Sequence, residues 1–223
     1  MSAVAILALY VGPSLAIGGI LFASAGRFDV PAVWWAYLGV WLVVSVAGAL
    51  SADPGLVQER LRPGPGARES LLLAAVIAGA LTASHFVIAG LDVGRFHCSD
   101  SVPVALRWAG LVVLVASLAI TQWATTVNRF FSSVVRVQSE RGHRVISSGP
   151  YAYVRHPGYA GGIGFALCSG IALGSWLSIL PNLMAIGLLV RRISREERVL
   201  REGLPGYESY QQRVRYRLVP GLW

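Results

Sequence analysis

The sequence has little charge and no lysine. Only 13% of its 223 residues are charged, whereas 55% are hydrophobic and the mean hydropathy is +0.59. Soluble globular domains have about a quarter charged residues, so this composition excludes water as the main solvent and predicts a membrane protein. All 19 basic residues are arginine, which we attribute to genome composition and on which no functional argument rests.

Cysteine is also scarce. Cys98 falls in a short loop and Cys168 in the middle of an apolar run, so the two thiols are expected at different depths and should not form a disulfide. His97 beside Cys98 resembles half of a metal site, but no second pair of ligands stands at a usable spacing. We therefore predict neither a structural disulfide nor a metal centre.

Long apolar runs take the place of charge. Four charge-free runs cover residues 1–26, 30–52, 70–91 and 108–128, and about 20 helical residues at ~1.5 Å each cross a ~30 Å hydrocarbon core. Each run therefore predicts one transmembrane helix. Residues 23–25 resemble a signal-peptidase site, but no basic segment precedes the first run, which favours a retained helix over a signal peptide.

The fifth run, residues 157–190, has 34 residues and is too long for one ordinary crossing. A turn is offered at its middle by residues 173–176, which predicts a two-helix hairpin with arms shorter than a full crossing. The predicted fold class is therefore all-α, a polytopic membrane protein with four transmembrane helices plus a C-terminal two-helix membrane hairpin.

Arginine-rich and arginine-poor segments alternate along the chain. Residues 53–69, 129–156 and 191–223 hold three, five and eight arginines, whereas 27–29 and 92–100 hold one each. By the positive-inside rule, the rich segments face the cytoplasm, together with both termini and any site on these segments. Topology and attraction to anionic lipid account for the basic charge, so no nucleic-acid partner is predicted.

A polar loop at residues 138–159 holds the first cluster of groups that can do chemistry. Two histidines, two arginines and three tyrosines fall within residues 143–159. Pro157 suits the first position of a helix, whose start would leave N–H groups near His156 and Gly158 unpaired and ready for an anionic group such as a cofactor carboxylate. The alternative is an interfacial belt, because Tyr and Arg favour the headgroup level for their own sake.

Residues 191–202 form the second cluster, which should be a helix continuing out of the hairpin. Arg192 and Glu196 share one face of it, and a plain i,i+4 ion pair, worth a few tenths of a kcal/mol, is an alternative to a functional role. Within the apolar runs, Gly162, Ala166 and Gly170 form a small-residue stripe that predicts close helix packing. His85 is expected to face the protein interior and to make a structural hydrogen bond.

Together these segments resemble the isoprenylcysteine carboxyl methyltransferase family and its bacterial relatives, within a wider group of membrane methyltransferases that includes phospholipid methyltransferases. The resemblance rests on Gly142-His143-x-Val145-Ile146, on Gly149-Pro150-Tyr151-x-x-Val154-Arg155-His156-Pro157-Gly158-Tyr159, and on Arg192-x-x-x-Glu196-Glu197-x-x-Leu200 followed by Gly206-Tyr207-x-x-Tyr210 and Pro220. Residues 59–66 and 128–131 resemble the bacterial branch.

The resemblance implies S-adenosylmethionine as methyl donor, bound from the cytoplasmic side. Its implied contacts are Gln138, His143, Arg144, Val145, Ile146, Tyr151, His156, Pro157, Gly158, Tyr159 and Glu196. Arg192 matches the substrate-binding arginine, and we assign catalytic roles to Arg192, Glu196 and Glu197. Residues 1–128 are then the N-terminal transmembrane helices, and residues 129–223 are the catalytic region with a cofactor loop, the membrane hairpin and a C-terminal amphipathic helix.

The acceptor decides which chemistry these residues must do. A carboxylate is already ionised at pH 7 and needs no base; Arg192 can orient it bidentately, while Glu196 can bind the donor's ammonium group or lie near its sulfonium. An amine or thiol must lose a proton, for which His143, His156 or Glu197 is a candidate.

We therefore predict an S-adenosylmethionine-dependent integral membrane methyltransferase that acts on a lipid-like or prenylated acceptor drawn from the bilayer. The alternatives are N-methylation of a phospholipid headgroup, S-methylation of a small thiol, or a small transporter or assembly subunit without enzymatic activity.

Overall fold

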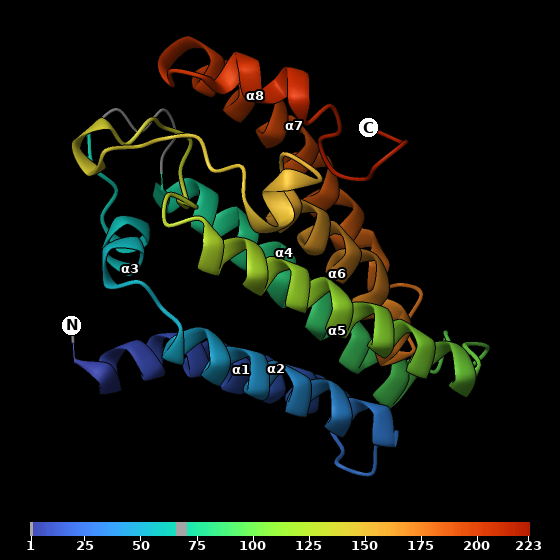
Figure 1. Ribbon diagram of the computed structural model, residues 1–223. Coiled ribbons are helices and arrows are strands. Elements are labelled where there is room, and N and C mark those ends of the chain that lie inside the picture. Colours follow the sequence, from blue (N-terminus) through green and yellow to red (C-terminus); the bar gives the residue numbers. More distant parts are fainter. Residues whose placement is uncertain (1, 66–70) are drawn as a thin grey trace.

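The protein is built from helices (Figure 1). It is described by a computed structural model over residues 2–65 and 71–223, and no strand occurs in those ranges. In chain order the helices are α1 (Ala3–Ala25), α2 (Ala32–Leu50), α3 (Pro54–Leu61), α4 (Leu71–Leu91), α5 (Val104–Val127), α6 (Pro157–Leu173), α7 (Ile179–Gly203) and α8 (Tyr207–Arg213). A π-helical turn, Asp92–Phe96, continues α4, and two 3₁₀ turns, Ser139–Arg141 and Gly149–Ala152, lie between α5 and α6.

Four of these helices are long and apolar enough to cross a membrane: Ala3–Ala25, Ala32–Leu50, Leu72–Phe96 and Val104–Val127. The all-α fold class and the four predicted spans are thereby confirmed. The first residue predicted for the third span and the end of the proline- and glycine-rich connector before it, residues 66–70, lie outside the described residues.

The hairpin is present, with unequal arms. α6 has 17 residues and α7 has 25, and the chain reverses between them at Gly174, which ends α6 in the left-handed conformation with φ +82°. The end of α6 is held by α2, since the Trp34 indole N–H donates to the Leu173 carbonyl (2.7 Å) and the Tyr37 hydroxyl lies 2.7 Å from the Ser169 hydroxyl. Buried hydrogen bonds of this kind fix one arrangement of the helices.

His85 joins the same network from α4 and faces the interior, as predicted. Its ring is 1% exposed, with Nδ1 2.7 Å from the Ser178 carbonyl and Nε2 2.7 Å from the Ser169 hydroxyl. Because Ser178 belongs to the hairpin turn and Ser169 to α6, one imidazole holds both sides of the hairpin against α4.

The helices pack pairwise into one bundle. α1 and α2 lie side by side, α1 also packs on α4 and α2 on α5, and the most extensive contact joins α5 to α6 (Figure 1). Large buried side chains from these helices make up the core: Leu21, Trp34, Tyr37, Phe86, Leu114 and Leu173.

Gly161 and Gly164 set the spacing of α5 and α6. A Cβ on Gly161 would lie 2.4 Å from the Ser117 carbonyl and one on Gly164 would lie 2.4 Å from the Ser117 hydroxyl, whereas one on Gly162 would meet its first neighbour only at 3.9 Å. The predicted stripe of residues 162, 166 and 170 faces α7. A Cβ on Gly170 would lie 2.7 Å from Ile179, and the Ala166 carbonyl accepts from the Asn182 amide at 2.8 Å.

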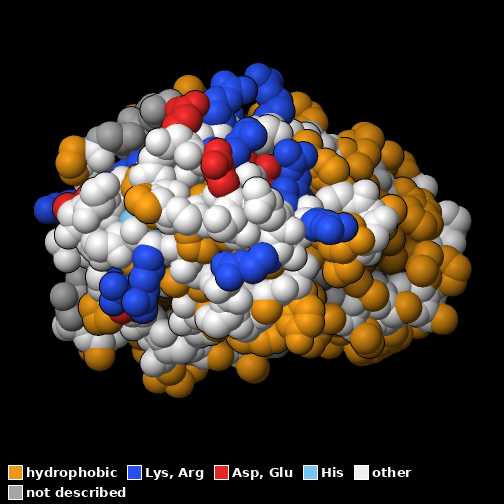
Figure 2. Space-filling view, turned by 45° about the horizontal axis from the view of Figure 1, so that its top comes forward, with side chains coloured by type: hydrophobic (Ala, Val, Ile, Leu, Met, Phe, Trp, Pro, Cys, Tyr) orange, Lys and Arg blue, Asp and Glu red, His pale blue; other side chains and the backbone are white. Residues whose placement is uncertain are grey.

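The arginine-rich segments gather at one end of the bundle. α3, the loop of residues 128–156, the end of α7 and α8 all lie there (Figure 1), and we call this the arginine-rich end. Figure 2 shows arginine side chains spread over this face while hydrophobic side chains dominate one flank of the molecule. Both described ends of the chain lie on this side of the long helices, and so do the two cavities described below.

Candidate active site

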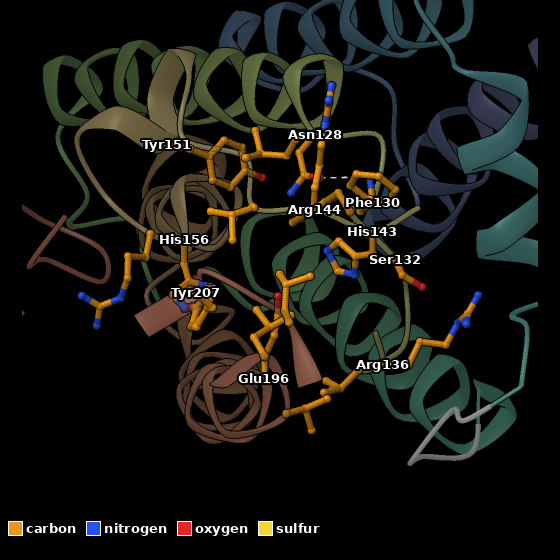
Figure 3. Close-up of a pocket in the computed structure, with 18 of the residues that line it drawn as sticks. Asn128, Phe130, Ser132, Arg136, His143, Arg144, Tyr151, His156, Glu196 and Tyr207 are labelled. Atoms are coloured by element: carbon orange, nitrogen blue, oxygen red, sulfur yellow. Dashed lines mark hydrogen bonds between the residues drawn. The ribbon is translucent and has the colours of Figure 1, made fainter. Parts of the chain in front are cut away.

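A cavity opens at the arginine-rich end, beside the start of α6 (Figure 3). Its walls come from the loop after α5, from the loop before α6, from the outer part of α7 and from α8. The lining residues are Asn128, Phe130, Phe131, Ser132, Val134, Val135, Arg136, His143, Arg144, Val145, Ile146, Tyr151, Arg155, His156, Tyr159, Glu196, Val199, Leu200, Leu204, Tyr207 and Tyr210.

Gln138 organises the loop that forms one wall. Its side chain is fully buried, its Nε2 donates to the Phe130 carbonyl (2.8 Å), and its Oε1 accepts from Arg141. Its backbone carbonyl also accepts from the His143 N–H at 3.2 Å. Gln138 thus connects two parts of the loop through hydrogen bonds. It does not line the cavity, although it was expected to contact the cofactor.

His143 presents a flat, neutral ring to the cavity. The ring stacks on Phe130 with centroids 4.5 Å apart, and its Nδ1 accepts from the Gln138 N–H at 3.2 Å. Burial, and then the charges of Arg136 and Arg141, lower the pKa of His143 to about 4. The imidazole is therefore uncharged at pH 7, with its proton on Nε2.

Two tyrosine hydroxyls in the cavity wall are buried and have no hydrogen-bond partner among the described residues. They belong to Tyr151 and Tyr207, which both line the cavity (Figure 3). Burial raises the pKa of both phenols, so both remain protonated donors. A buried unsatisfied hydroxyl costs free energy, which a polar ligand in this cavity would offset.

Tyr159 connects the two clusters expected to do chemistry. Its hydroxyl donates to Glu196 Oε2 at 2.6 Å and accepts from Arg192 Nε at 2.8 Å. Arg192 also donates through Nη2 to the Ser133 carbonyl at 2.6 Å. Glu196 and Tyr159 line the cavity, whereas Arg192 lies in the wall behind them. The Tyr159 hydroxyl therefore bridges Glu196 and Arg192, the two residues expected to share one face of the helix.

The Glu197 carboxylate does not line the cavity and is bound by basic side chains. It is 1% exposed and accepts from Arg155 Nε (2.7 Å) and Arg217 Nε (2.9 Å), with His156 Nε2 at 3.3 Å. Burial raises its pKa, but the bonds from His156 and Arg155 outweigh burial and lower the pKa to about 2. Glu197 is therefore a weak base and a tie between α7, α6 and the C-terminal segment.

The C-terminal segment also forms a hydrogen bond with the His156 backbone N–H, which was expected to be unpaired. The His156 N–H at the start of α6 donates to the Arg217 carbonyl at 2.8 Å, and the Arg155 N–H donates to the Tyr216 carbonyl at 3.0 Å. The expectation of an unpaired N–H at His156 is wrong, because residues far along the chain return to pair with it.

Eight of the predicted cofactor residues line the cavity: His143, Arg144, Val145, Ile146, Tyr151, His156, Tyr159 and Glu196. Five predicted site residues do not line it: Gln138, Pro157, Gly158, Arg192 and Glu197. Gly158 is set against Phe131, since a Cβ there would lie 2.8 Å from that ring. The loop residues 130–136 were not predicted to line a site, and they have no periodicity that would reveal them. Val199 and Leu200 also line the cavity, and their spacing from Glu196 at i+3 and i+4 places them on the same helix face.

Residues 108–202 match the model of the isoprenylcysteine carboxyl methyltransferase (ICMT) family. The match covers 95 of the 223 residues, from α5 to the outer part of α7. The matched segment holds every residue that lines the cavity except Leu204, Tyr207 and Tyr210.

Three curated proteins named as isoprenylcysteine O-methyltransferases are similar to part of this chain. Proteins named probable protein-S-isoprenylcysteine O-methyltransferase from Oryza sativa subsp. indica and subsp. japonica are each 34% identical over 112 residues, which cover 49% of this chain and 59% of theirs. The protein-S-isoprenylcysteine O-methyltransferase of Schizosaccharomyces pombe is 35% identical over 86 residues, covering 38% of this chain and 36% of that protein. The chain thus matches about a third to three fifths of the length of these relatives.

The fold extends the likeness beyond the ICMT segment. A solved structure of the eukaryotic intramembrane Ras methyltransferase ICMT, without a monobody, superposes with a TM-score of 0.60 at 21% identity and covers 99% of this chain and 77% of that one. The helical arrangement of this chain is therefore similar to the fold of that structure.

Proposed function

We propose that this chain is an S-adenosylmethionine-dependent integral membrane methyltransferase of the isoprenylcysteine carboxyl O-methyltransferase type. One observation carries the proposal. A cavity formed largely by the segment that matches the ICMT family model is lined by the Glu196 carboxylate and by Tyr151 and Tyr207, whose hydroxyls are buried and unsatisfied. A ligand with both a cation and polar groups suits this set, and the cavity lies where the membrane helices end.

The lining residues fit the proposed cofactor. S-adenosylmethionine supplies a methyl group on a sulfonium, together with an amino acid end and an adenosine. Glu196 would attract the sulfonium or the ammonium group, and Tyr151 and Tyr207 would donate hydrogen bonds. The stacked rings of Phe130 and His143 offer a flat face of the kind on which a purine packs.

The reaction needs no proton transfer if the acceptor is a carboxylate. The acceptor oxygen forms a bond to the methyl carbon while the carbon–sulfur bond breaks, the electron pair stays on sulfur, and S-adenosylhomocysteine is the neutral product. Positioning and exclusion of water then supply the rate.

The candidate bases favour this acceptor over an amine or thiol. The pKa of Glu197 is about 2 and that of His143 is about 4, and the His156 Nε2 lies against Glu197. A phospholipid amine or a small thiol would need a stronger base than these groups provide. The acceptor we propose is lipid-like or prenylated and carries a carboxylate, and Arg192 is its proposed anchor.

The membrane setting completes the proposal. The arginine-rich end faces the cytoplasm of a bacterial inner membrane with both termini there, in keeping with the positive-inside rule. In this proposal the chain belongs to a bacterial branch of the family, and that branch is related to phospholipid methyltransferases. Residues 129–223 carry the chemistry, and residues 1–128 anchor them.

Binding of S-adenosylhomocysteine to the detergent-purified chain tests the proposal. We expect Glu196→Gln and Tyr207→Phe each to weaken binding about 10-fold, because each removes one charged or polar contact. Tyr216→Phe, at an exposed tyrosine outside the cavity, is the matched control and should not change affinity. With labelled donor, the methyl should enter lipid-like material as a base-labile ester. Folded wild-type chain that does not bind S-adenosylhomocysteine would refute the enzyme.

A further inference from the structure

A second cavity lies at the arginine-rich end, on the other side of the loop that follows α5. It is bounded by α1, α2, α3 and α5, and its polar lining includes Tyr10, Ser51, Arg60, Gln122 and Thr125. Tyr10, Gln122 and Thr125 belong to apolar membrane helices, so the cavity lies where the bilayer ends. The polar headgroups of phospholipids occupy this depth of a membrane.

Arg60 brings a positive charge to the second cavity. No carboxylate pairs with it in the part of the chain that the structure describes; its Nε donates to the Phe131 carbonyl at 3.1 Å, and its guanidinium carbon lies 5.5 Å from the centre of the Phe131 ring. The side chain is partly buried, and burial lowers its pKa, although an arginine stays charged at pH 7. A buried charge without a counter-ion costs free energy, which a bound anion would offset.

The acidic side chain in the lining does not supply that counter-ion. Asp53 caps α3 by accepting from the Leu56 N–H at 2.6 Å, and its carboxylate lies 3.8 Å from Arg141. The Tyr10 side chain is a hydrogen-bond partner of Arg60, and its hydroxyl can donate to an anion that binds there. The second cavity therefore presents one cation and a hydroxyl donor to a single anionic group.

Exposed apolar side chains stand next to lining residues in the chain. Leu50 precedes Ser51 and is 84% exposed, and Trp123 follows Gln122 and is 49% exposed. Both belong to membrane helices, α2 and α5, and acyl chains of the bilayer would cover them. A free anion would use only the charge of the cavity, whereas a phospholipid would use the charge and the apolar surface together.

Residues 131–133 separate the second cavity from the first. Phe131 and Ser132 line both cavities, and Glu196 lies on the far side of this wall. A head group held on Arg60 is therefore out of reach of a methyl group held beside Glu196. The ligand of the second cavity is bound and not consumed.

We infer that the second cavity binds the phosphate of a membrane phospholipid, with Arg60 as its cation and Tyr10 as a hydroxyl donor. A guanidinium can bind two phosphate oxygens at once through parallel N–H groups, and no covalent bond is made or broken. The acyl chains of the lipid lie against the membrane helices that border the cavity. Binding of this lipid does not require the reaction in the first cavity.

Lipid binding by the whole chain, purified in detergent and freed of lipid, tests this site. Native mass spectrometry measures the Kd of dioctanoyl-phosphatidylglycerol, which wild type should bind saturably. Arg60→Met should weaken this binding about 10-fold or more, since it loses a charge-assisted contact. Arg60→Lys should recover part of the loss, because it restores the charge without the planar fork.

The matched control is Arg62→Met, which removes the same charge from an exposed position two residues along the chain and should bind the phospholipid as wild type does. Dioctanoylglycerol has the same acyl chains without the phosphate and should bind wild type about 10-fold more weakly or worse. Inorganic phosphate should displace the phospholipid only in large excess, because it lacks the acyl chains.

Equal affinity of Arg60→Met and wild type for the phospholipid would overturn the inference. Equal weakening by Arg62→Met would also overturn it, because general charge attraction would then explain the binding. If inorganic phosphate competes as well as the phospholipid does, the cavity takes a free anion and not a lipid. If Arg60→Met does not fold, wild type decides through its two lipids, and equal affinity for dioctanoylglycerol and dioctanoyl-phosphatidylglycerol would refute a phosphate site.

Discussion

Glu59 in α3 supports the cavity lined by His143 and Glu196, which is proposed to bind the methyl donor and which we call the donor cavity. Its carboxylate accepts from Arg136 Nε at 2.8 Å and from Arg136 Nη2 at 2.7 Å, and also from the Ser132 hydroxyl at 3.1 Å. Arg136 and Ser132 both line the donor cavity. We predict that Glu59→Gln destabilises the protein and weakens donor binding.

The magnitude follows from burial. The side chains of Arg136 and Glu59 are 1% and 4% exposed, and breaking such a pair from one side costs about 3–5 kcal/mol. Glutamine keeps the shape, and Glu140 continues to pair with Arg136, so we expect a loss of about 2–3 kcal/mol in the free energy of unfolding. For a chain of this size that corresponds to a fall in Tm of roughly 5–10 °C.

The sign of the pH dependence gives a second readout. Burial raises the pKa of Glu59, but the bonds from Arg136 and Ser132 outweigh burial and lower it. A carboxyl with a lowered folded-state pKa contributes stability above its ordinary pKa and loses that contribution as the pH falls through the folded value. The wild type should therefore lose stability in acid, and Glu59→Gln should lose less.

Tryptophan fluorescence during thermal unfolding in detergent measures the change, alongside the Kd of S-adenosylhomocysteine. Glu140→Gln is the matched control, because it removes an ion-pair partner of Arg136 whose side chain is 46% exposed, and it should cost less than about 1 kcal/mol. If Glu59→Gln and Glu140→Gln melt together, the buried pair does not support the cavity and the reasoning is refuted.

Three further outcomes are expected. Glu197→Gln should lower Tm and make the chain after α8 more sensitive to protease, because it breaks the tie to Arg217; an unchanged digest would contradict the tie. Gly161→Val should abolish folded protein in a gel-filtration assay while Gly162→Val is tolerated, because a Cβ at Gly161 would lie 2.4 Å from a carbonyl; equal yields would contradict this packing. Donor affinity should be constant from pH 7 to 5 and fall towards pH 4 as His143, with a pKa of about 4, gains a proton beside two arginines; His143→Phe should remove that fall.

The fold could be predicted because it depends on long local patterns. Four charge-free runs, a 34-residue run with a glycine at its middle and alternating arginine content each report on a contiguous segment. The contact of α6 with α5 could not be predicted the same way, because Gly161, Gly162 and Gly164 lie close together in the sequence and only the position of α5 decides which of them is crowded.

The candidate site was predictable where a motif is contiguous and not where it depends on distant segments. Glu196 and Glu197 are neighbours with the same chemistry, but they lie on different faces of α7. Glu196 accepts from Tyr159, whereas Glu197 is bound by Arg155 and by Arg217 of the returning C-terminal segment. The resemblance supplied His143, Tyr151 and Glu196. It did not supply Arg136, whose role depends on a partner 77 residues earlier in the sequence.

Neighbouring residues of α3 contact two different cavities. Glu59 binds Arg136, which lines the donor cavity, while Arg60 donates to the Phe131 carbonyl and lines a second cavity between α1, α2, α3 and α5. Because residues 131–136 are the wall that these two contacts share, a shift of α3 would change both cavities together.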